Sequence, residues 1–248
     1  MPVQFQNFEF RYELNGRHIF VPSKLGERIG EDVKEKVESA YAFDAFIYHL
    51  RKKGGHVSAL HAHREHHFFA RLDIRRFFYG ISRSRVRRTL ADIGIGRALH
   101  YAKWSCVKNP YGAPAYALPY GFIQSPVLAT LVLMESGVGK FLRSLATKGL
   151  VLPTVYMDDL SLSSDDLSAL QMAFDELLIE VGNAGFEVSP NKTRAPGAAI
   201  DLFNCDLSHG QTRVSDDRIN AFLANHPSQH SEDAFVSYCE SVEVGNYP

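Results

Sequence analysis

The chain has 248 residues, which is enough for one large domain or for two small domains that share a core. Hydrophobic residues make up 45% of it and charged residues 22%, and this balance excludes a wholly disordered chain. No apolar run approaches the roughly 18 residues that a membrane span needs, and no secretion signal is visible, so we expect a cytoplasmic protein with no membrane partner.

The three cysteines are Cys106, Cys205 and Cys239. They are widely spaced, odd in number and form no CxxC pair. This usage is typical of a reducing cytosol and argues against a disulfide framework or a cysteine-based zinc site.

Charge is distributed very unevenly although the formal net charge is only −1. Between Arg51 and Pro110, 14 lysines and arginines stand against 3 acids, whereas between Leu150 and Pro248 the numbers are 4 and 16. The basic segment could follow a phosphate backbone or a triphosphate, or it could be a solvated face of the protein.

The first half of the chain predicts a helix over residues 28–50, followed by a basic, glycine-bearing turn over 51–56. A short apolar run over 67–74 predicts a buried strand that ends on one acid. Ser82 or Ser84 could cap a helix that runs to about Asp92, and a turn is expected over 111–114.

The second half predicts a helix over residues 125–146, with Ser125 as its N-cap and Pro126 in its first turn. Two short strands joined at an acidic turn are expected over 151–163. An amphipathic helix over 165–184, a hairpin over 198–214 and one helix in the tail from Asp216 complete the pattern. Strands and helices interleave, so the fold class is α+β.

Adjacent acids at Asp158 and Asp159 follow Tyr156 and Met157 in an otherwise apolar strand sequence. Successive side chains of a strand alternate between faces, so both acids can approach one point only at a tight turn. Asp73 also ends an apolar strand, and neighbouring strands would bring the three carboxylates together. Carboxylate oxygens suit Mg²⁺, and such a triad is the arrangement that two-metal phosphoryl transfer needs. Taken singly, each Asp is explained equally well as a turn former.

Four segments resemble motifs A to D of reverse transcriptases, in the same order: LDIRRFF (72–78), LPYGFIQSP (118–126), YMDD (156–159) and GFEVSPNKT (185–193). The resemblance covers roughly residues 20 to 215. It is closest to bacterial enzymes, namely retrons, group II intron enzymes and the phage-defence-associated "unknown group". The retron His box is represented by His63, but Ala59 stands where that box has Asn.

The resemblance implies a right-hand polymerase with a ferredoxin-like antiparallel palm sheet, helices on one face of that sheet, fingers and a reduced thumb. Residues 1–67 would form the N-terminal part of the fingers. Residues 68–200 would form the palm with an interleaved fingers segment, and residues 201–248 the primer-grip hairpin and a minimal thumb. No RNase H domain or maturase extension fits in the last 55 residues.

The resemblance also assigns a role to the acids and the aromatic residue of motif A. Asp73, Ile74, Asp158 and Asp159 would surround two Mg²⁺ ions, with Mn²⁺ as an alternative. Phe78 would be the steric gate that excludes a ribose 2′-hydroxyl, although Phe77 and Phe78 are equally explained by core packing.

Motif B departs from the family pattern. Gly121 matches it, but Tyr120 stands where the family usually has a Gln whose amide meets the incoming nucleotide. A phenol cannot reproduce the paired donor and acceptor of an amide. We therefore expect unusual base choice, fidelity or template use.

Basic residues would contact phosphates. Lys192 matches the family lysine near the departing pyrophosphate, and Arg51 and Lys52 match a pair that grips the triphosphate. A basic stretch could lie along a nucleic-acid backbone or be a solvated helix face; it comprises Arg83, Arg85, Arg87 and Arg88.

Five histidines fall within twelve residues: His56, His61, His63, His66 and His67. A zinc site is conceivable, but no cysteine or carboxylate cluster completes it. Structural hydrogen bonds or contacts to phosphate explain this composition better.

The sequence thus predicts an RNA-directed DNA polymerase that uses an RNA template and dNTPs to make a DNA product, in antiviral defence with a dedicated non-coding RNA. A protein partner or an oligomer could supply the missing grip on the duplex. A template-independent or protein-primed polymerase is the first alternative, motivated by Tyr120 and the reduced thumb. The second is a non-catalytic nucleic-acid-binding scaffold, against which the intact triad argues.

Overall fold

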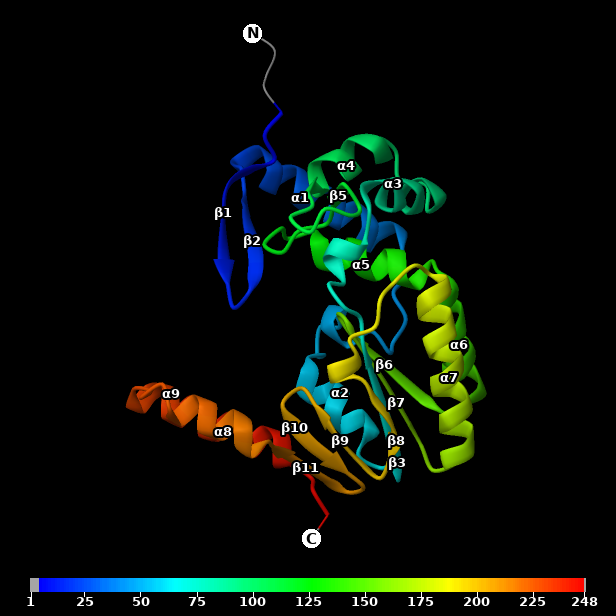
Figure 1. Ribbon diagram of the computed structural model, residues 1–248, viewed down its shortest axis with the longest axis vertical. Helices are drawn as coiled ribbons and strands as arrows, with labels where there is room; N and C mark the ends of the chain where they lie inside the picture. Colours follow the sequence, from blue (N-terminus) through cyan, green and yellow to red (C-terminus); the bar gives the residue numbers. More distant parts are fainter. Residues whose placement is uncertain (1–4, 248) are drawn as a thin grey trace. The chain divides into compact units, whose positions relative to one another are not determined.

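The computed structural model describes residues 5–247, and these form two compact units (Figure 1). Neither unit is a continuous stretch of chain. The first contains the chain up to Asp44, Ile74–Lys140 and Glu180–Glu187. The second contains Ala45–Asp73, Phe141–Ile179 and the chain from Val188 onward. The predicted assignment of residues 1–67, 68–200 and 201–248 to fingers, palm and thumb stays a prediction, and residues 45–67 pack with the second unit.

The first unit begins with a hairpin that the sequence did not predict. Strands β1 (Phe8–Leu14) and β2 (Arg17–Pro22) pair antiparallel. Both turn residues, Asn15 and Gly16, have positive φ angles of 51° and 72°. Asn-Gly is the preferred dipeptide for such a two-residue turn, because both residues tolerate the left-handed conformation.

Helix α1 (Lys24–Ala40) starts at Ser23, whose hydroxyl accepts from the Gly26 N–H. The expected helix over 28–50 is therefore wrong beyond residue 40. The second unit explains the difference, because Ile47 forms a bridge with Val155 there and the Val155 N–H donates to the Phe46 carbonyl. Only the 3-10 turn Tyr48–Leu50 follows. Tertiary pairing thus overrides the local helical pattern.

The rest of the first unit is built from short elements around a small core. They are the 3-10 turn Phe78–Gly80, α3 (Arg83–Asp92), α4 (Ala98–Ser105), β4 (Val107–Lys108), β5 (Tyr116–Ala117) and α5 (Ser125–Met134). Ser82 caps α3 as expected, accepting from the Arg85 N–H. One buried apolar cluster of this unit consists of Phe20, Tyr79, Val107, Ala117 and Phe122.

The single helix expected over 125–146 is wrong, because two helices, α5 and α6 (Gly137–Lys148), meet there at 73°. The Ser136 hydroxyl donates to the Leu133 carbonyl and so ends α5. A Cβ at Gly139 would lie 2.1 Å from the Met134 carbonyl oxygen, so this close bend requires glycine. The N-cap of α5 is Gln124 and not Ser125. No single described helix is long and apolar enough to span a membrane; only α5 and α6 taken together reach that length and composition, and α5 is a buried core helix.

The main sheet lies in the second unit and has the order β6-β7-β3-β8, with every neighbouring pair antiparallel. Its strands are β3 (Phe68–Asp73), β6 (Leu152–Tyr156), β7 (Asp159–Ser164) and β8 (Arg194–Gly197). Figure 1 shows α6 and α7 (Leu167–Asn183) side by side along one face of this sheet. The strands expected over 67–74 and 151–163 are confirmed.

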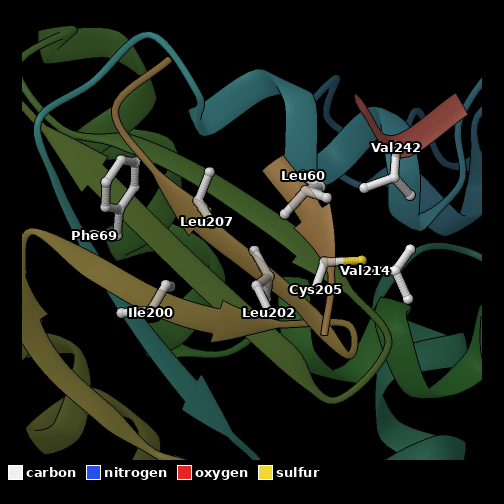
Figure 2. Close-up of a cluster of buried hydrophobic side chains, with 8 residues drawn as sticks. All are labelled: Leu60, Phe69, Ile200, Leu202, Cys205, Leu207, Val214 and Val242. Atoms are coloured by element: carbon white, nitrogen blue, oxygen red, sulfur yellow. The ribbon is translucent and has the colours of Figure 1, made fainter. Parts of the chain in front are cut away.

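A second sheet of three strands packs in the same unit. The expected hairpin is present as β10 (Cys205–Ser208) and β11 (Gln211–Val214), and β9 (Ala199–Leu202) adds a third strand. Its apolar side chains meet β3 and α2 (His56–His63) in the cluster drawn in Figure 2. The tail forms two helices and not one, α8 (Asp216–Leu223) and α9 (Gln229–Glu243), because Pro227 interrupts the helix and Ser228 caps the next.

The five clustered histidines all make structural hydrogen bonds within the second unit. His63 is buried, with Nδ1 2.7 Å from the Ser163 hydroxyl and Nε2 2.7 Å from the Thr154 hydroxyl. The partners of the other four are Tyr238 for His56, Val242 for His61, Ser163 for His66 and Asp165 for His67. The cluster therefore ties α2 and the loop after it to the surrounding sheets and helices.

The buried His63 predicts a pH dependence of stability. Burial lowers its pKa to about 3, whereas an unfolded histidine titrates near 6.5. As the pH falls below about 6.5 the unfolded chain binds the proton first, so the folded state loses stability. We expect His63 to contribute a loss of about 1 kcal/mol between pH 7.5 and 5.5. Denaturant unfolding at both pH values should show this loss in the wild type and a smaller one in His63→Gln. A matched change at exposed His226 should leave the slope unaltered, and equal slopes for wild type and His63→Gln would contradict the assignment.

Candidate active site

The two adjacent acids lie at the tip of the β6–β7 hairpin. Tyr156 pairs with Asp159, so Met157 and Asp158 form a two-residue turn. Met157 has a φ of 59°, a left-handed conformation that is unfavourable for a long side chain. Its N–H donates to His49 Nδ1 at 3.0 Å. Burial lowers the pKa of His49 to about 4, so its ring is neutral and can accept this bond.

Asp73 lies directly opposite Asp159, because β3 and β7 are antiparallel neighbours in that register. Residues opposite each other in an antiparallel pair have Cα atoms roughly 4.5–5.5 Å apart and side chains on one face. Asp73 is only 2% exposed. The convergence of Asp73 with the acidic hairpin, expected from the sequence alone, is therefore a property of the sheet.

Each of the two opposed carboxylates already holds a side-chain cation. Lys192 Nζ lies 3.2 Å from Asp73 Oδ2. The Arg71 guanidinium contacts Asp159 Oδ1 through Nε at 2.8 Å and Nη2 at 2.7 Å. Lys192 reaches this point from the 3-10 turn Pro190–Lys192, which is anchored because the Ser189 N–H donates to the Asp73 carbonyl.

The electrostatics around Asp159 favour a further cation. The pKa of Asp159 is raised to about 6, chiefly by burial and also by the neighbouring Asp158 and Asp73, while Arg71 opposes this rise. Placing the buried Asp73 beside two partly buried acids is costly unless positive charge compensates them. Arg71 and the half-exposed Lys192 supply such charge at Asp159 and Asp73.

The donor set fits a hard divalent cation. Asp73, Asp158 and Asp159 present carboxylate oxygens only, the ligand type that Mg²⁺ and Mn²⁺ prefer. Two of these carboxylates attract cations even in the protein alone. With the side chains in their present orientation, no three His, Cys, Asp or Glu residues between 5 and 247 are placed to share one ion. Ile74, the fourth residue expected at the metals, follows Asp73 and is fully buried.

In the first unit, the expected steric gate contacts the residue that departs from the motif B pattern. Phe78 is 7% exposed, and its ring meets Tyr120 edge to face with centroids 4.7 Å apart. Gly121 has a φ of 98°, and a Cβ there would lie 2.2 Å from the Phe20 carbonyl oxygen. This glycine is therefore required for motif B to approach strand β2.

The remaining predicted contact residues differ in exposure. Arg51 and Lys52 are exposed on the turn before α2, and the Arg51 guanidinium stacks on Tyr48 at 4.5 Å. On α3, Arg83 and Arg85 pack on the aromatic rings of Tyr116 and Phe186, and burial lowers the pKa of Arg85. The other two arginines of that stretch, Arg87 and Arg88, are exposed. The four are thus divided between aromatic packing and exposure to solvent.

Three residues at the hairpin were not recognised from the sequence: Arg71, Asp201 and His49. For Arg71 a signal existed, since a charged residue inside a buried strand two positions before Asp73 must share the face of that aspartate. His49 and Asp201 come from distant segments, and only the tertiary structure brings them to the hairpin.

A family model described as reverse transcriptase (RNA-dependent DNA polymerase) matches residues 16–198, which is most of the chain. The chain belongs to the reverse transcriptase family. The antiparallel sheet with helices on one face is the palm fold of that family, so the α+β fold class predicted from the sequence is confirmed.

Solved structures of a viral reverse transcriptase and of a telomerase are similar to this chain at low identity. A foamy viral protease–reverse transcriptase in complex with double-stranded DNA is 14% identical with a TM-score of 0.48, and the match covers 84% of this chain and 30% of that one. Telomerase from Candida albicans in complex with a fragment of telomeric RNA is 13% identical with a TM-score of 0.47, covering 79% and 34%. This reverse transcriptase chain therefore spans about a third of their length. A search of curated proteins finds no match.

The carboxylate cluster of this reverse transcriptase predicts stabilisation by metal. At ten times its dissociation constant, Mn²⁺ should stabilise the folded wild type by about 1.4 kcal/mol, or roughly 3–6 °C in thermal unfolding. Asp158→Asn should lose most of this shift, because it removes one charged ligand. Asp206→Asn is the matched control, since Asp206 is an exposed acid of β10 paired with Arg213. An Asp158→Asn shift as large as that of the wild type would exclude Asp158 as a ligand.

Proposed function

We propose that this chain is an RNA-directed DNA polymerase that extends a 3′-hydroxyl end with dNTPs by two-metal phosphoryl transfer. The observation that carries the proposal is the register of β3 and β7, which sets Asp73 opposite Asp159 beside the turn that bears Asp158. Membership of the reverse transcriptase family supports it. An intact set of three acids distinguishes such an enzyme from a scaffold that only binds nucleic acid.

Each site residue has a defined task in this proposal. Asp73, Asp158 and Asp159 would hold two Mg²⁺ or Mn²⁺ ions, which when bound activate the attacking hydroxyl and neutralise charge on the leaving phosphate. Neutral His49 keeps the hairpin turn in shape through the Met157 amide.

Basic and aromatic residues act on the nucleotide. Lys192, which lies against Asp73, would stabilise or protonate the departing pyrophosphate. Arg51 and Lys52 would bind the triphosphate as charge-assisted donors. Phe78 would lie under the sugar, with Tyr120 and Gly121 beside it.

The partners and setting that we propose are an RNA template, a DNA product and a bacterial cytoplasm, with a role in antiviral defence alongside a dedicated non-coding RNA. The exposed arginines Arg87 and Arg88 are the side chains of α3 best able to contact a nucleic-acid backbone. Sequencing the RNA and DNA that co-purify with the chain tests this setting, and recovery of neither would count against it.

The Tyr120 contact favours a second candidate, a polymerase of the same fold that works without a nucleic-acid template or primes on a protein hydroxyl. The Tyr120 ring supports Phe78 from its edge, so this position is used for packing where the family offers an amide to the nucleotide. A polymerase that does not read a template has less need of that amide.

Incorporation of labelled dNTPs on an RNA template with an annealed primer tests the main proposal. We expect Mg²⁺-dependent extension by the wild type, and loss of activity by at least about a thousandfold in Asp158→Ala and Asp159→Ala. Circular dichroism should give wild-type helix and strand content for both variants. Product sequence decides between the candidates, because a homopolymer or repeat unrelated to the RNA favours untemplated synthesis. Wild-type rates from either variant would refute the metal assignment.

The gate predicts a change in sugar selectivity. Phe78→Ala should admit ribonucleotides, because it removes the bulk that blocks a 2′-hydroxyl, and the preference for dNTP over NTP should fall by about tenfold or more. Phe77→Leu is the control, since Phe77 is buried against Phe186 and should affect stability without affecting selectivity. Unchanged discrimination in Phe78→Ala would remove the gate role.

A further inference from the structure

Arg71 is a buried arginine in the strand that carries Asp73. It is 9% exposed and lies two residues before the aspartate in β3. Side chains at positions i and i+2 of a strand share one face, so the guanidinium emerges beside the carboxylates. Burying an arginine in a palm strand is costly unless its donors are satisfied.

The Arg71 guanidinium joins the acidic hairpin to the second sheet. Two of its nitrogens contact Asp159 Oδ1, at 2.8 and 2.7 Å. Its third nitrogen, Nη1, lies 3.1 Å from Asp201 Oδ2 and 3.3 Å from the Asp201 carbonyl oxygen. Asp201 belongs to β9, and its other carboxylate oxygen is 2.5 Å from Arg194 Nε. Charges therefore alternate along one line: Asp159, Arg71, Asp201 and Arg194.

We propose that Arg71 is a positioning residue that fixes where the Asp159 carboxylate stands and couples the catalytic hairpin to strand β9. Arg71 binds Oδ1 of Asp159, so the guanidinium would set the orientation in which this carboxylate meets a metal. The proposal rests on the proposed polymerase function, because positioning matters only if Asp159 acts on a metal-bound substrate.

Arginine suits this task for a geometric reason. Its planar guanidinium presents donors on three nitrogens in fixed directions, so it can hold two carboxylates at once. A lysine at this position would keep the charge but has a single nitrogen, which cannot reproduce both sets of contacts. Arg71→Lys therefore separates the geometry of the bridge from its charge.

The contact between Arg71 and Asp201 connects the position of Asp159 to the position of strand β9. The segment from 199 to 215 forms β9, β10 and β11, and it overlaps residues 201–248, where the resemblance to reverse transcriptases implies the primer-grip hairpin. A displacement of β9 would move Asp201, and through Arg71 it would move Asp159. The position of the catalytic acid is then linked to the state of this sheet.

The experiment compares Arg71→Lys, Asp201→Asn and the double variant with the wild type. The matched control is Arg28→Lys, because Arg28 is an exposed arginine of helix α1 and lies outside the bridge. Three quantities are measured: kcat and KM for dNTP per active molecule, Mn²⁺ affinity by electron paramagnetic resonance, and amide hydrogen exchange of residues 157–160.

We expect Arg71→Lys to lower kcat by about ten- to a hundredfold, with KM for dNTP changed by less than about threefold. Asp201→Asn should lower kcat in the same direction but less. The double variant should be no worse than Arg71→Lys alone, because both changes break one bridge. Exchange of the hairpin amides should accelerate in all three, and Mn²⁺ affinity should persist. Arg28→Lys should match the wild type.

Two results would overturn the inference. One is unchanged hairpin exchange together with unchanged kcat in Arg71→Lys. The other is an equal loss in Arg71→Lys and Arg28→Lys, which would indicate a general effect of replacing an arginine. If the wild type shows no polymerase activity, the proposed function fails, and the hydrogen-exchange measurement still decides whether Arg71 holds the hairpin.

Discussion

The register between β3 and β7 is the constraint on which the candidate site depends. It places Asp73 opposite Asp159, and both carboxylates lie on a largely buried strand pair. Two like charges in such a place repel each other and lose hydration. The surrounding chain responds with Arg71 from the same strand and Lys192 from the turn before β8. The palm sheet thus brings carboxylates together, and their repulsion lowers the stability of the fold. A divalent cation that binds between them would restore part of this stability.

The hairpin tip adds a second local cost. Met157 has a left-handed backbone, which an L residue with a long side chain adopts unfavourably. The bond from its N–H to neutral His49 offsets part of this strain and fixes the turn that carries Asp158. His49 belongs to the short 3-10 turn that forms where the sequence predicted a continuous helix. Residues 46–47 pair with Val155. This pairing explains both why the predicted helix does not continue and why His49 lies next to the hairpin.

Local sequence signals were sufficient for β3, β6, β7 and α3, because each has a clear apolar pattern or a capping serine near its ends. The convergence of Asp73 with Asp158 and Asp159 could also be predicted, since acids at the ends of neighbouring strands meet at one edge. The break between α5 and α6 could not, because it depends on the approach of Gly139 to the Met134 carbonyl. Arg71 and Asp201 are 130 residues apart, and no local pattern indicates that they share a bridge. Residues that support the acids are thus harder to predict than the acids themselves.

The charge pattern constrains how the proposed polymerase could hold a duplex. Helices α8 and α9 begin with Asp216, Asp217 and Glu232, which complement the helix dipoles. Their surface is acidic, and Arg218 is the single lysine or arginine within the two helices. Such a surface repels a phosphate backbone within a Debye length of about 8–10 Å. A grip on nucleic acid must therefore come from basic side chains elsewhere in the chain or from a partner. Because phosphate contacts are the main source of affinity for nucleic acid, any binding that the proposed polymerase makes through the basic segment between Arg51 and Pro110 should weaken steeply with added salt.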